Sequence, residues 1–390
     1  MVERSTTRTQ LATSQVCVRC GCSRGHIPLL CCGPIETTQC LISLADYAPT
    51  SAYLADLWKI NKVSVPQLAR DAVTLKKELA KYNIGRTVAG PSFAGISSED
   101  AAAFLPIAGD GEVDAYTVHN YPYGGKDCNV TKYLDKMPVT VKLAQKLTNV
   151  SAIAATAAPN MLLVLEEVAG SSGGGCDNVT DRFVAGFAWL PTLATVGASG
   201  FDRVHRQDIA GWSFAFGKSN YMLVGQPGWV NGSAELLTPH PDYFTTLLWK
   251  QLVGRRVLAT GLTGDADFFF ASAWCASARA PYGDGGSVVV AWTNSASTPT
   301  TVALPRALAR AAATSFLLSG SPSPAGDAGD LVSDDVWLNG QHLVINDDGT
   351  LPAYPFDGAK QPPAATVDVP PYSYGFLVFD TSAADVPACV

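Results

Sequence analysis

The sequence of 390 residues has no long uninterrupted apolar run and no cluster of basic residues. Its longest apolar stretch, residues 153–165, is broken by Pro159 and Asn160. A membrane-spanning helix needs about 20 predominantly apolar residues, so we expect no transmembrane span. Lys and Arg number 27 against 34 Asp and Glu, and the net charge is −7. Nucleic acid and densely sulfated polyanions are therefore not expected partners, because their binding requires clustered positive charge.

The N-terminus also lacks a recognisable secretory signal, because its first segment is polar. Glycosylation sequons nevertheless favour a secretory route. Four asparagines stand in the Asn-x-Ser/Thr pattern: Asn129, Asn149, Asn178 and Asn231. We therefore expect the protein to be extracellular, lysosomal or vacuolar, or membrane-associated within the secretory pathway.

Cysteine is unevenly distributed, since six of the ten cysteines lie within the first 40 residues. That segment also holds His26, but it lacks a second Cys pair at the spacing of a zinc ribbon. We therefore expect neither a metal nor another cofactor, and an N-terminal zinc site is the alternative. Residues 1–45 resemble no recognisable unit and are interpreted as a poorly ordered extension.

Residues 46–256 alternate between expected strands and expected helices. Apolar residues at helical spacing predict helices at 66–82, 97–108, 139–150, 179–200 and 241–256, with a capping signature at Ser98. Runs rich in β-branched and aromatic residues predict strands at 85–92, 112–121, 160–167 and 201–208, the first ending in a Gly-Pro loop. This alternation is typical of a parallel α/β fold, and polar groups at strand ends favour part of a (β/α)8 TIM barrel.

Residues 257–390 have a different pattern. Short β runs follow one another, separated by Gly, Pro, Asp and Ser, with no expected helix between them. This pattern predicts an all-β sandwich appended to the barrel. The expected fold class is therefore α/β plus all-β, a partial (β/α)8 barrel followed by a C-terminal β-sandwich.

Two adjacent carboxylates, Glu166 and Glu167, end the strand expected at residues 160–167. Because side chains alternate along a strand, one of them should face the site while its neighbour points away. Two other strand ends add polar groups, namely His119, Asn120 and Tyr121 on one and His205, Arg206 and Gln207 on the other. Carboxyl ends of barrel strands meet at one face, so these groups together describe a sugar-binding site. Taken singly, His119 also fits a core histidine, Arg206 a salt-bridge partner and Tyr121 a packing residue.

Several motifs are similar to those of one known family. The segment "LEEVAGSSGGGC" resembles a nucleophile strand in which a Glu precedes a Gly run by six residues, and "VHNYPYGGK" resembles the strand before it. The segments "HRQDIAGWSFAFGKSNYMLV" and "PHPDYFTTLLWKQLVGRRVL" also look familial. From about residue 65 to the C-terminus, the chain thus resembles the heparanase-like proteins, glycoside hydrolase family 79.

The resemblance implies retaining hydrolysis of β-glucuronosides in glycans or proteoglycans. One carboxylate attacks the anomeric carbon, and a second protonates the leaving oxygen. Glu167, six residues before Gly173, matches the nucleophile, which leaves Glu166 as its outward-pointing neighbour. The positions that match substrate contacts are His119, Tyr121, Lys126, Gly173, Gly174, Gly175, Arg206, Gln207, Asn220 and Tyr221.

The resemblance also implies one disulfide. It matches Cys275 with Cys389, a bond that would tie the end of the sandwich to one of its early strands. Cys128 and Cys176 both fall on loops at the expected barrel mouth and could form a second pair.

The sequence departs from the family at the acid/base. The resemblance places this residue in an Asn-Glu pair shortly before residue 66, and no such pair occurs there. The nearest acids are Glu36, Asp46 and Asp56, of which Asp46 lies nearest the expected position and is the candidate stand-in. Six β/α units before Glu167 would need well over about 200 residues. We therefore expect the front of the barrel to be missing.

Two hypotheses follow. The first is a heparanase-like retaining β-glucuronidase with Glu167 as its nucleophile. The second is a catalytically impaired or inactive carbohydrate-binding homologue. Residues 97–100 carry two Ser, a Glu and an Asp where the resemblance would put basic side chains, so weakly charged glucuronosides are favoured over sulfated ones.

Overall fold

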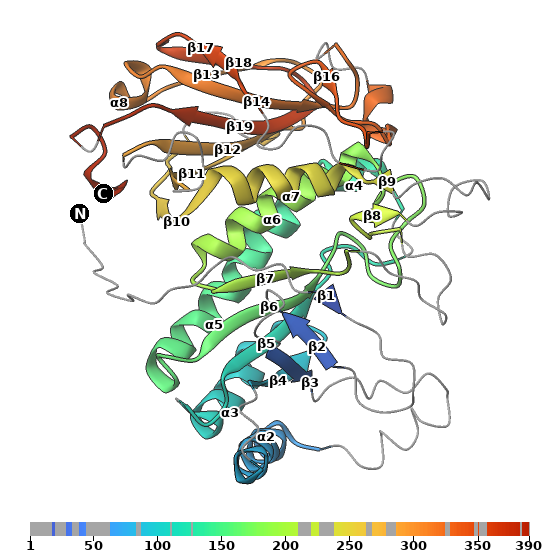
Figure 1. Cartoon of the computed structure of the whole chain (residues 1–390), viewed down its shortest axis with the longest axis vertical. Helices are drawn as coiled ribbons and strands as arrows, with labels where there is room; N and C mark the ends of the chain where they lie inside the picture. The colour runs from blue at the N-terminus through green and yellow to red at the C-terminus, as the bar shows by residue number, and fades with distance from the viewer. Residues whose placement is uncertain are drawn as a thin grey trace.

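The computed structural model describes residues 63–82, 87–109, 111–125, 128–209, 220–225, 238–262, 267–277, 286–323, 328–346, 350, 357–382 and 384–389, together with the backbone of three short strands between residues 18 and 43. The expected site residues Lys126 and Asp46 lie outside this part of the chain, as do Glu36, His26 and Asn231. Figure 1 shows a lower part built on one sheet, an upper part built on another, and long helices between them.

The lower sheet has seven strands that follow one another in sequence order. They are β1 (Val18–Arg19), β2 (Leu29–Cys32), β3 (Gln39–Ser43), β4 (Val88–Phe93), β5 (Ala115–Asn120), β6 (Leu162–Val168) and β7 (Arg203–Arg206). The pairs from β3 to β7 are parallel, and those from β1 to β3 are antiparallel. The carboxyl ends of β4 to β7 therefore lie along one edge, where the site is built.

Helices lie between these strands in sequence, and the last one follows them. They are α2 (Val65–Lys81), α3 (Ser98–Ala108), α4 (Val130–Tyr133), a π-helical turn (Pro138–Lys142) that leads into α5 (Leu143–Ala157), a 3-10 turn (Phe183–Ala185) that leads into α6 (Gly186–Ala198), and α7 (Pro241–Leu252). Residues of α2, α3, α5 and α6 pack against Tyr116, Val118, Leu163 and Leu165 on the outer face of the sheet. No described helix is long and apolar enough to cross a membrane.

The upper part is an antiparallel sheet of eight strands. These are β10 (Val253–Leu258), β11 (Phe269–Ala276), β12 (Val288–Asn294), β14 (Ala313–Ser319), β15 (Trp337–Leu338), β16 (Gln341–His342), β17 (Ala359–Gln361) and β19 (Ser373–Phe379). One face packs on a smaller layer of β13 (Thr300–Ala303), β18 (Thr366–Val369) and α8 (Arg306–Ala309). Elsewhere β8 (Val224–Gly225) pairs with β9 (Thr238–Pro239), and short 3-10 turns cover Ala328–Val332 and Pro387–Cys389.

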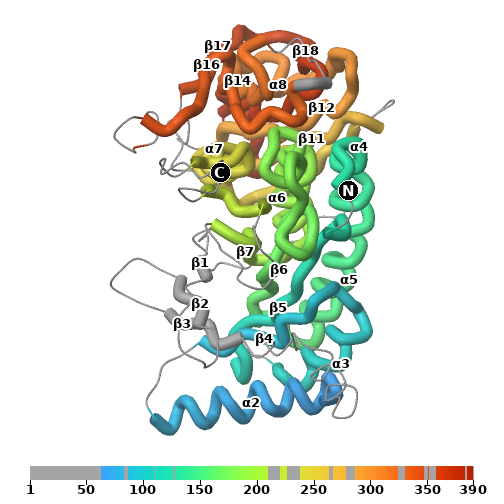
Figure 2. The backbone as a smooth tube through the Cα atoms, turned by 90° about the vertical axis from the view of Figure 1, so that its right-hand side faces the viewer, coloured from blue at the N-terminus to red at the C-terminus, as the bar shows by residue number. Residues whose placement is uncertain are grey.

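The α/β plus all-β class is confirmed, but a barrel is not, and the upper part differs from the expected sandwich. The lower sheet runs from β1 to β7 without closing on itself among the described strands. The second layer of the upper part contains two strands rather than a full sheet, and α8 stands where no helix was expected. In both views α6 and α7 lie between the two sheets (Figures 1 and 2).

Several local predictions are wrong in detail. The N-cap of α3 is Ser97, whose side chain accepts a hydrogen bond from the Asp100 N–H, and not Ser98. The Gly-Pro pair lies within β4 instead of ending it, because a register shift between Pro91 and Phe93 lets the strand accommodate a residue without an N–H. The helix from Pro241 ends at Leu252, where the chain becomes extended and pairs with β11.

Candidate active site

Strand β6 contains a bulge that decides which way its two carboxylates point. Val118 of β5 pairs with Leu165, but the next residue, His119, pairs with Glu167, so Glu166 is the extra residue. A bulge interrupts the alternation of side chains, and both carboxylates therefore reach His119 on the inner face. The expectation that Glu166 points outward is wrong for this reason.

Glu167 is partly exposed, and its carboxylate is held by two neighbours. The Tyr121 hydroxyl donates a hydrogen bond of 2.5 Å to Oε1, and His119 Nδ1 lies 3.8 Å from Oε2. The side chain of Glu167 is 23% exposed, against 7% for Glu166. Burial first, and then the negative charge of Glu167, raise the pKa of Tyr121 far above its ordinary value. Tyr121 therefore keeps its proton and acts as a donor to the carboxylate.

Glu166 has a closed polar environment. The Ser92 hydroxyl donates a hydrogen bond of 2.6 Å to its Oε2, Thr117 bonds to it as well, and His119 Nε2 lies 3.7 Å away. Burial alone would raise the pKa of Glu166, but the hydrogen bonds from His119, Ser92 and Thr117 outweigh it and hold the pKa below its ordinary value. Glu166 is therefore a buried anion and not a proton donor.

The loop after β6 carries Gly173, Gly174 and Gly175, with φ angles of 71°, 95° and 84°. L-residues with side chains rarely adopt these angles. At Gly175 there is also no room, since a Cβ would lie 2.5 Å from a threonine hydroxyl. The Gly174 carbonyl accepts a hydrogen bond of 2.6 Å from the Asn220 N–H. The glycines thus allow a ligand to approach the backbone closely.

Tyr221 and Gln207 extend the hydrogen-bond chain that begins at Glu167. Tyr221 bonds to both Tyr121 and Gln207, and the rings of the two tyrosines lie 6.1 Å apart. Asn220 instead turns its amide to the Asp177 carboxylate, 2.7 Å away. The structure therefore brings Glu167, Tyr121, Tyr221 and Gln207 together, with Asn220 bracing the glycine loop.

Both disulfides are present. Cys128 is bonded to Cys176 with a Cα–Cα distance of 5.3 Å, and Cys275 is bonded to Cys389 with one of 5.2 Å. The first bond joins the loop after β5 to the glycine loop. It therefore restrains the backbone at the end of the glycine loop.

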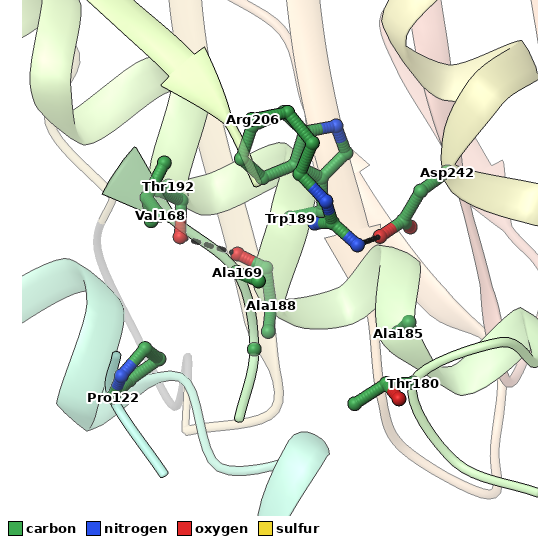
Figure 3. Close-up of a pocket in the computed structure, with 11 residues that line it drawn as sticks. Pro122, Val168, Ala169, Thr180, Ala185, Ala188, Trp189, Thr192, Arg206 and Asp242 are labelled. Atoms are coloured by element: carbon green, nitrogen blue, oxygen red, sulfur yellow. Dashed lines mark hydrogen bonds and ion pairs between the residues drawn. The ribbon is translucent and has the colours of Figure 1, made fainter. Parts of the chain in front are cut away.

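Arg206 lies elsewhere than its expected place among the substrate contacts. On β7 it follows His205 and, by alternation, faces the helices of the outer side. Its Nη2 lies 2.9 Å from the Asp242 carboxylate of α7, and its guanidinium lies 4.7 Å above the Trp189 ring (Figure 3). Two further hydrogen bonds, of 2.9 and 3.1 Å, reach the Tyr221 carbonyl. Arg206 thus braces the backbone of Tyr221 from behind.

A small pocket lies beside this ion pair. Val168, Trp189, Arg206 and Asp242 are among its lining residues, whereas Glu167 is not (Figure 3). Burial raises the pKa of Asp242 to about 6, and the Arg206 guanidinium limits the rise. The pocket therefore belongs to the packing behind the site rather than to the site itself.

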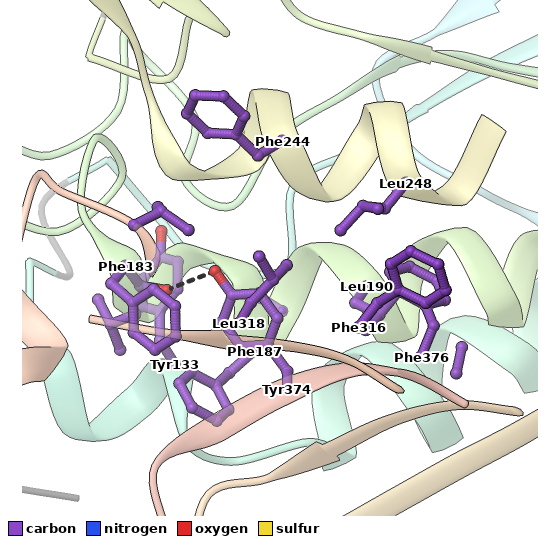
Figure 4. Packing of buried hydrophobic residues seen from close by; sticks show 14 of the residues in the cluster. Tyr133, Phe183, Phe187, Leu190, Phe244, Leu248, Phe316, Leu318, Tyr374 and Phe376 are labelled. Carbon is purple, nitrogen blue, oxygen red and sulfur yellow. Dashed lines mark hydrogen bonds between the residues drawn. The ribbon is translucent and has the colours of Figure 1, made fainter. Parts of the chain in front are cut away.

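Helix α6, whose Trp189 ring lies against the Arg206 guanidinium, is held from its other side by the upper sheet. Phe183 and Phe187 meet Tyr374 of β19 with ring centroids 4.5 and 5.2 Å apart (Figure 4). A Cβ added at Gly186 would lie 2.2 Å from the Tyr374 ring, so this contact needs glycine. The upper sheet thus fixes α6, and through it the position of Arg206.

His205, on the inner side of β7, is 3% exposed. Neither ring nitrogen has a hydrogen-bond partner within the described part of the chain. Burial lowers the pKa of His205 to about 4, in spite of the nearby Glu166 charge. It is therefore a neutral histidine at ordinary pH.

Sequence reasoning missed Ser92 and Asp242. One signal in the sequence points to Ser92, namely the Gly-Pro pair that precedes it, which indicates unusual backbone at that point. Asp242 gave no signal beyond its place in the first turn of α7. The described residues contain no group of three or more His, Cys, Asp or Glu placed to hold a metal ion.

Comparison with known proteins first defines the class. A 4-O-α-L-rhamnosyl-β-D-glucuronidase from Fusarium oxysporum, solved with a Rha-GlcA ligand, superimposes with a TM-score of 0.58 at 14% identity, over 81% of this chain and 65% of that one. At that identity the likeness concerns the fold alone, and it gives the chain the fold of a glycoside hydrolase.

Sequence relatives then define the family. The heparanase of Bos taurus is 31% identical over 293 residues, which are 74% of this chain and 48% of the relative. The inactive heparanase-2 of Homo sapiens is 30% identical over 341 residues, 81% of this chain and 52% of the relative. No protein-family model matches the chain. The chain belongs to the heparanase-like proteins, glycoside hydrolase family 79, and spans about half the length of these relatives.

Proposed function

We propose that this chain carries the nucleophile side of a retaining β-glucuronidase site, with Glu167 as the nucleophile. The observation that carries the proposal is the Glu167 carboxylate, 23% exposed at the carboxyl edge of the sheet and oriented by the 2.5 Å hydrogen bond from Tyr121. The glycine loop 173–175 lies beside it and offers backbone N–H groups to an anionic sugar. His119, Tyr221 and Gln207 complete the proposed substrate contacts.

The acid/base partner is proposed to lie outside the described residues. Retaining hydrolysis needs a second carboxyl about 5–5.5 Å from the nucleophile that is neutral before the bond breaks. Glu166 does not meet this need, because its pKa is lowered and its oxygens are occupied by Ser92 and Thr117. Asp46 stays the proposed stand-in.

Substrates with a good leaving group provide the test, because they need no protonation to leave. We expect 2,4-dinitrophenyl β-D-glucuronide to release about one equivalent of dinitrophenol rapidly, leaving glucuronic acid esterified to Glu167. Mass spectrometry of the peptide that contains Glu167 measures this adduct. Glu167→Gln should give no burst and no adduct, whereas Glu78→Gln, an exposed control on α2, should behave as the unaltered chain.

The competing function is that of a non-catalytic carbohydrate-binding homologue. It is favoured by the closed environment of Glu166, which leaves Glu167 without a neutral carboxyl partner among the contacts described above. Under this alternative, a folded sample binds a glucuronic acid-containing oligosaccharide but forms no adduct at Glu167. That outcome would overturn the role of Glu167 as nucleophile.

We propose glucuronosides of glycans or proteoglycans with little sulfation as the substrate class. Glu99 and Asp100 lie in the first turn of α3, just after β4, and therefore near the edge that carries the site. Their negative charge opposes a sulfated chain. Stronger binding of heparan sulfate than of unsulfated hyaluronan oligosaccharides would contradict this substrate class.

A secretory location is part of the same proposal. The two disulfides support it, because such bonds persist in oxidising compartments. Three of the sequon asparagines, Asn129, Asn149 and Asn178, are exposed and open to modification. Expression through the secretory route should give a mass loss on treatment with peptide N-glycosidase, and an unchanged mass would contradict the proposal.

A further inference from the structure

Ser92 stands between two groups that compete for its single proton. It is 8% exposed and lies at the bulge of β4 with φ of 61°, which turns its side chain toward the inner face. Its Oγ lies 2.6 Å from Glu166 Oε2 and 2.8 Å from His119 Nε2. Both distances are those of real hydrogen bonds.

The count of protons decides the direction of each bond. An ionised carboxylate has no proton to give, so Ser92 must donate its proton to Glu166. The Ser92 oxygen can then only accept at its second contact, and the proton in that contact must belong to His119 Nε2. The other ring nitrogen, Nδ1, faces Glu167 Oε2 at 3.8 Å.

The charged and titratable groups around His119 agree with this arrangement. Glu166 and Glu167 of β6 flank its two nitrogens, and Tyr121 lies just beyond β5 as a donor to Glu167. His205 of β7 is neutral, because its burial outweighs the effect of the nearby Glu166 charge. Burial would raise the pKa of Glu166, but hydrogen bonds from His119, Ser92 and Thr117 outweigh it and lower the pKa, so Glu166 is ionised.

We propose that Ser92 and Glu166 are positioning residues that keep His119 Nε2 protonated, so that Nδ1, the nitrogen facing Glu167, is where His119 gains and loses its proton. When Nδ1 is unprotonated, it donates no hydrogen bond to Glu167, and the carboxylate oxygen that faces it is free to attack. This consequence for catalysis rests on the proposed function, whereas the tautomer itself does not.

Nitrogen-15 NMR of the histidine rings in the full chain tests the tautomer. His119→Gln assigns the signal among the five histidines. At alkaline pH we expect the neutral ring of His119 to carry its proton on Nε2. In Glu166→Ala the Ser92 proton is released and donates to Nε2, so the ring should switch to the Nδ1–H form. Glu166→Gln keeps an acceptor oxygen for Ser92 and should restore the Nε2–H form.

Ser92→Ala gives an independent measurement if Glu166→Ala does not fold. Loss of one hydrogen bond should reduce the preference for Nε2–H by about fivefold. An Nδ1–H tautomer in the unaltered chain would overturn the proposal. So would an unchanged tautomer in folded samples of both alanine variants.

Labelling of Glu167 measures the consequence for the site. A glucuronic acid-configured cyclophellitol probe should label Glu166→Ala about tenfold more slowly than the unaltered chain, because a fixed Nδ1–H donor weakens the nucleophile. Glu166→Gln should recover most of the rate, which a loss of packing alone would not predict. If the unaltered chain takes no label, the proposed function fails while the tautomer measurement still decides this inference.

Discussion

Two charged clusters lie on opposite faces of strands β6 and β7, and they differ in how far they are closed. On the inner face, Glu167 is 23% exposed and meets Tyr121 and His119. On the outer face, the side chains of Arg206 and Asp242 are 3% and 2% exposed and bond to each other beneath α6 and α7. One cluster keeps a carboxylate open to a ligand, while the other uses its charges to brace the backbone.

The difference shows that a strand-end position does not by itself make a residue functional. Arg206 and His205 are neighbours in sequence, yet alternation on β7 sends them to opposite clusters. At β6 the bulge does the reverse and brings Glu166 and Glu167 to one face. The face of the sheet to which a side chain points therefore decides whether it can contact a ligand or supports the structure.

The largest expected effect on stability comes from removing one member of the closed cluster, the ion pair of Arg206 and Asp242. Asp242→Ala leaves the buried Arg206 guanidinium without its carboxylate, so we expect the free energy of unfolding to fall by about 3–5 kcal/mol. Urea unfolding measures it. Glu167→Ala, the matched change in the open cluster, should cost less than about 1 kcal/mol, since a partly exposed carboxylate is readily replaced by water.

The double variant Arg206→Met with Asp242→Leu sharpens this prediction. Because apolar residues can replace a buried ion pair at little cost, it should recover most of the loss. No recovery would mean that the bonds of Arg206 to the Tyr221 carbonyl, rather than the ion pair, carry the stability. Equal losses for Asp242→Ala and Glu167→Ala would break the comparison itself.

The second prediction concerns pH, because His205 and Asp242 change the stability of the fold in opposite directions. The pKa of His205 is lowered to about 4 in the fold, so the unfolded chain binds a proton first and stability falls as the pH drops from about 6.5 to 4. The pKa of Asp242 is raised to about 6, so the folded chain binds the proton first and stability falls as the pH rises from about 4 to 6. Each effect is on the order of 3 kcal/mol.

Two variants separate the pH dependence of stability that His205 causes from the one that Asp242 causes. His205→Leu should unfold more easily at pH 6 than at pH 4, because Asp242 then dominates. Asp242→Asn should show the opposite trend, because His205 then dominates. Urea unfolding of both variants at the two pH values measures the slopes, and slopes of equal sign would contradict the assignment of one neutral base and one raised acid.

The sequence predicted most of the elements but not the directions of the side chains that matter. Apolar spacing placed α2 and α5, and β-rich runs placed β5 and β6. The orientation of Glu166 depends on a bulge, and a bulge is a property of strand pairing that periodicity along one chain does not contain. Ser92 and Asp242 act through contacts with residues 74 and 36 positions away, so only the fold brings them to their partners.

The smallest predicted effect concerns the open cluster, which consists of Glu167, Tyr121 and His119 on the inner face. Tyr121→Phe removes the 2.5 Å hydrogen bond to Glu167 but keeps the ring and its packing against Tyr221. One hydrogen bond to a charged group contributes about 1.5–3 kcal/mol when buried and less at a partly exposed site. Because this bond orients the attacking carboxylate, we expect its loss to slow labelling of Glu167 by roughly tenfold, measured as the rate constant with the cyclophellitol probe, while the urea midpoint stays unchanged. A shifted midpoint with an unchanged labelling rate would reassign Tyr121 to structural support, and the open cluster would then resemble the closed one.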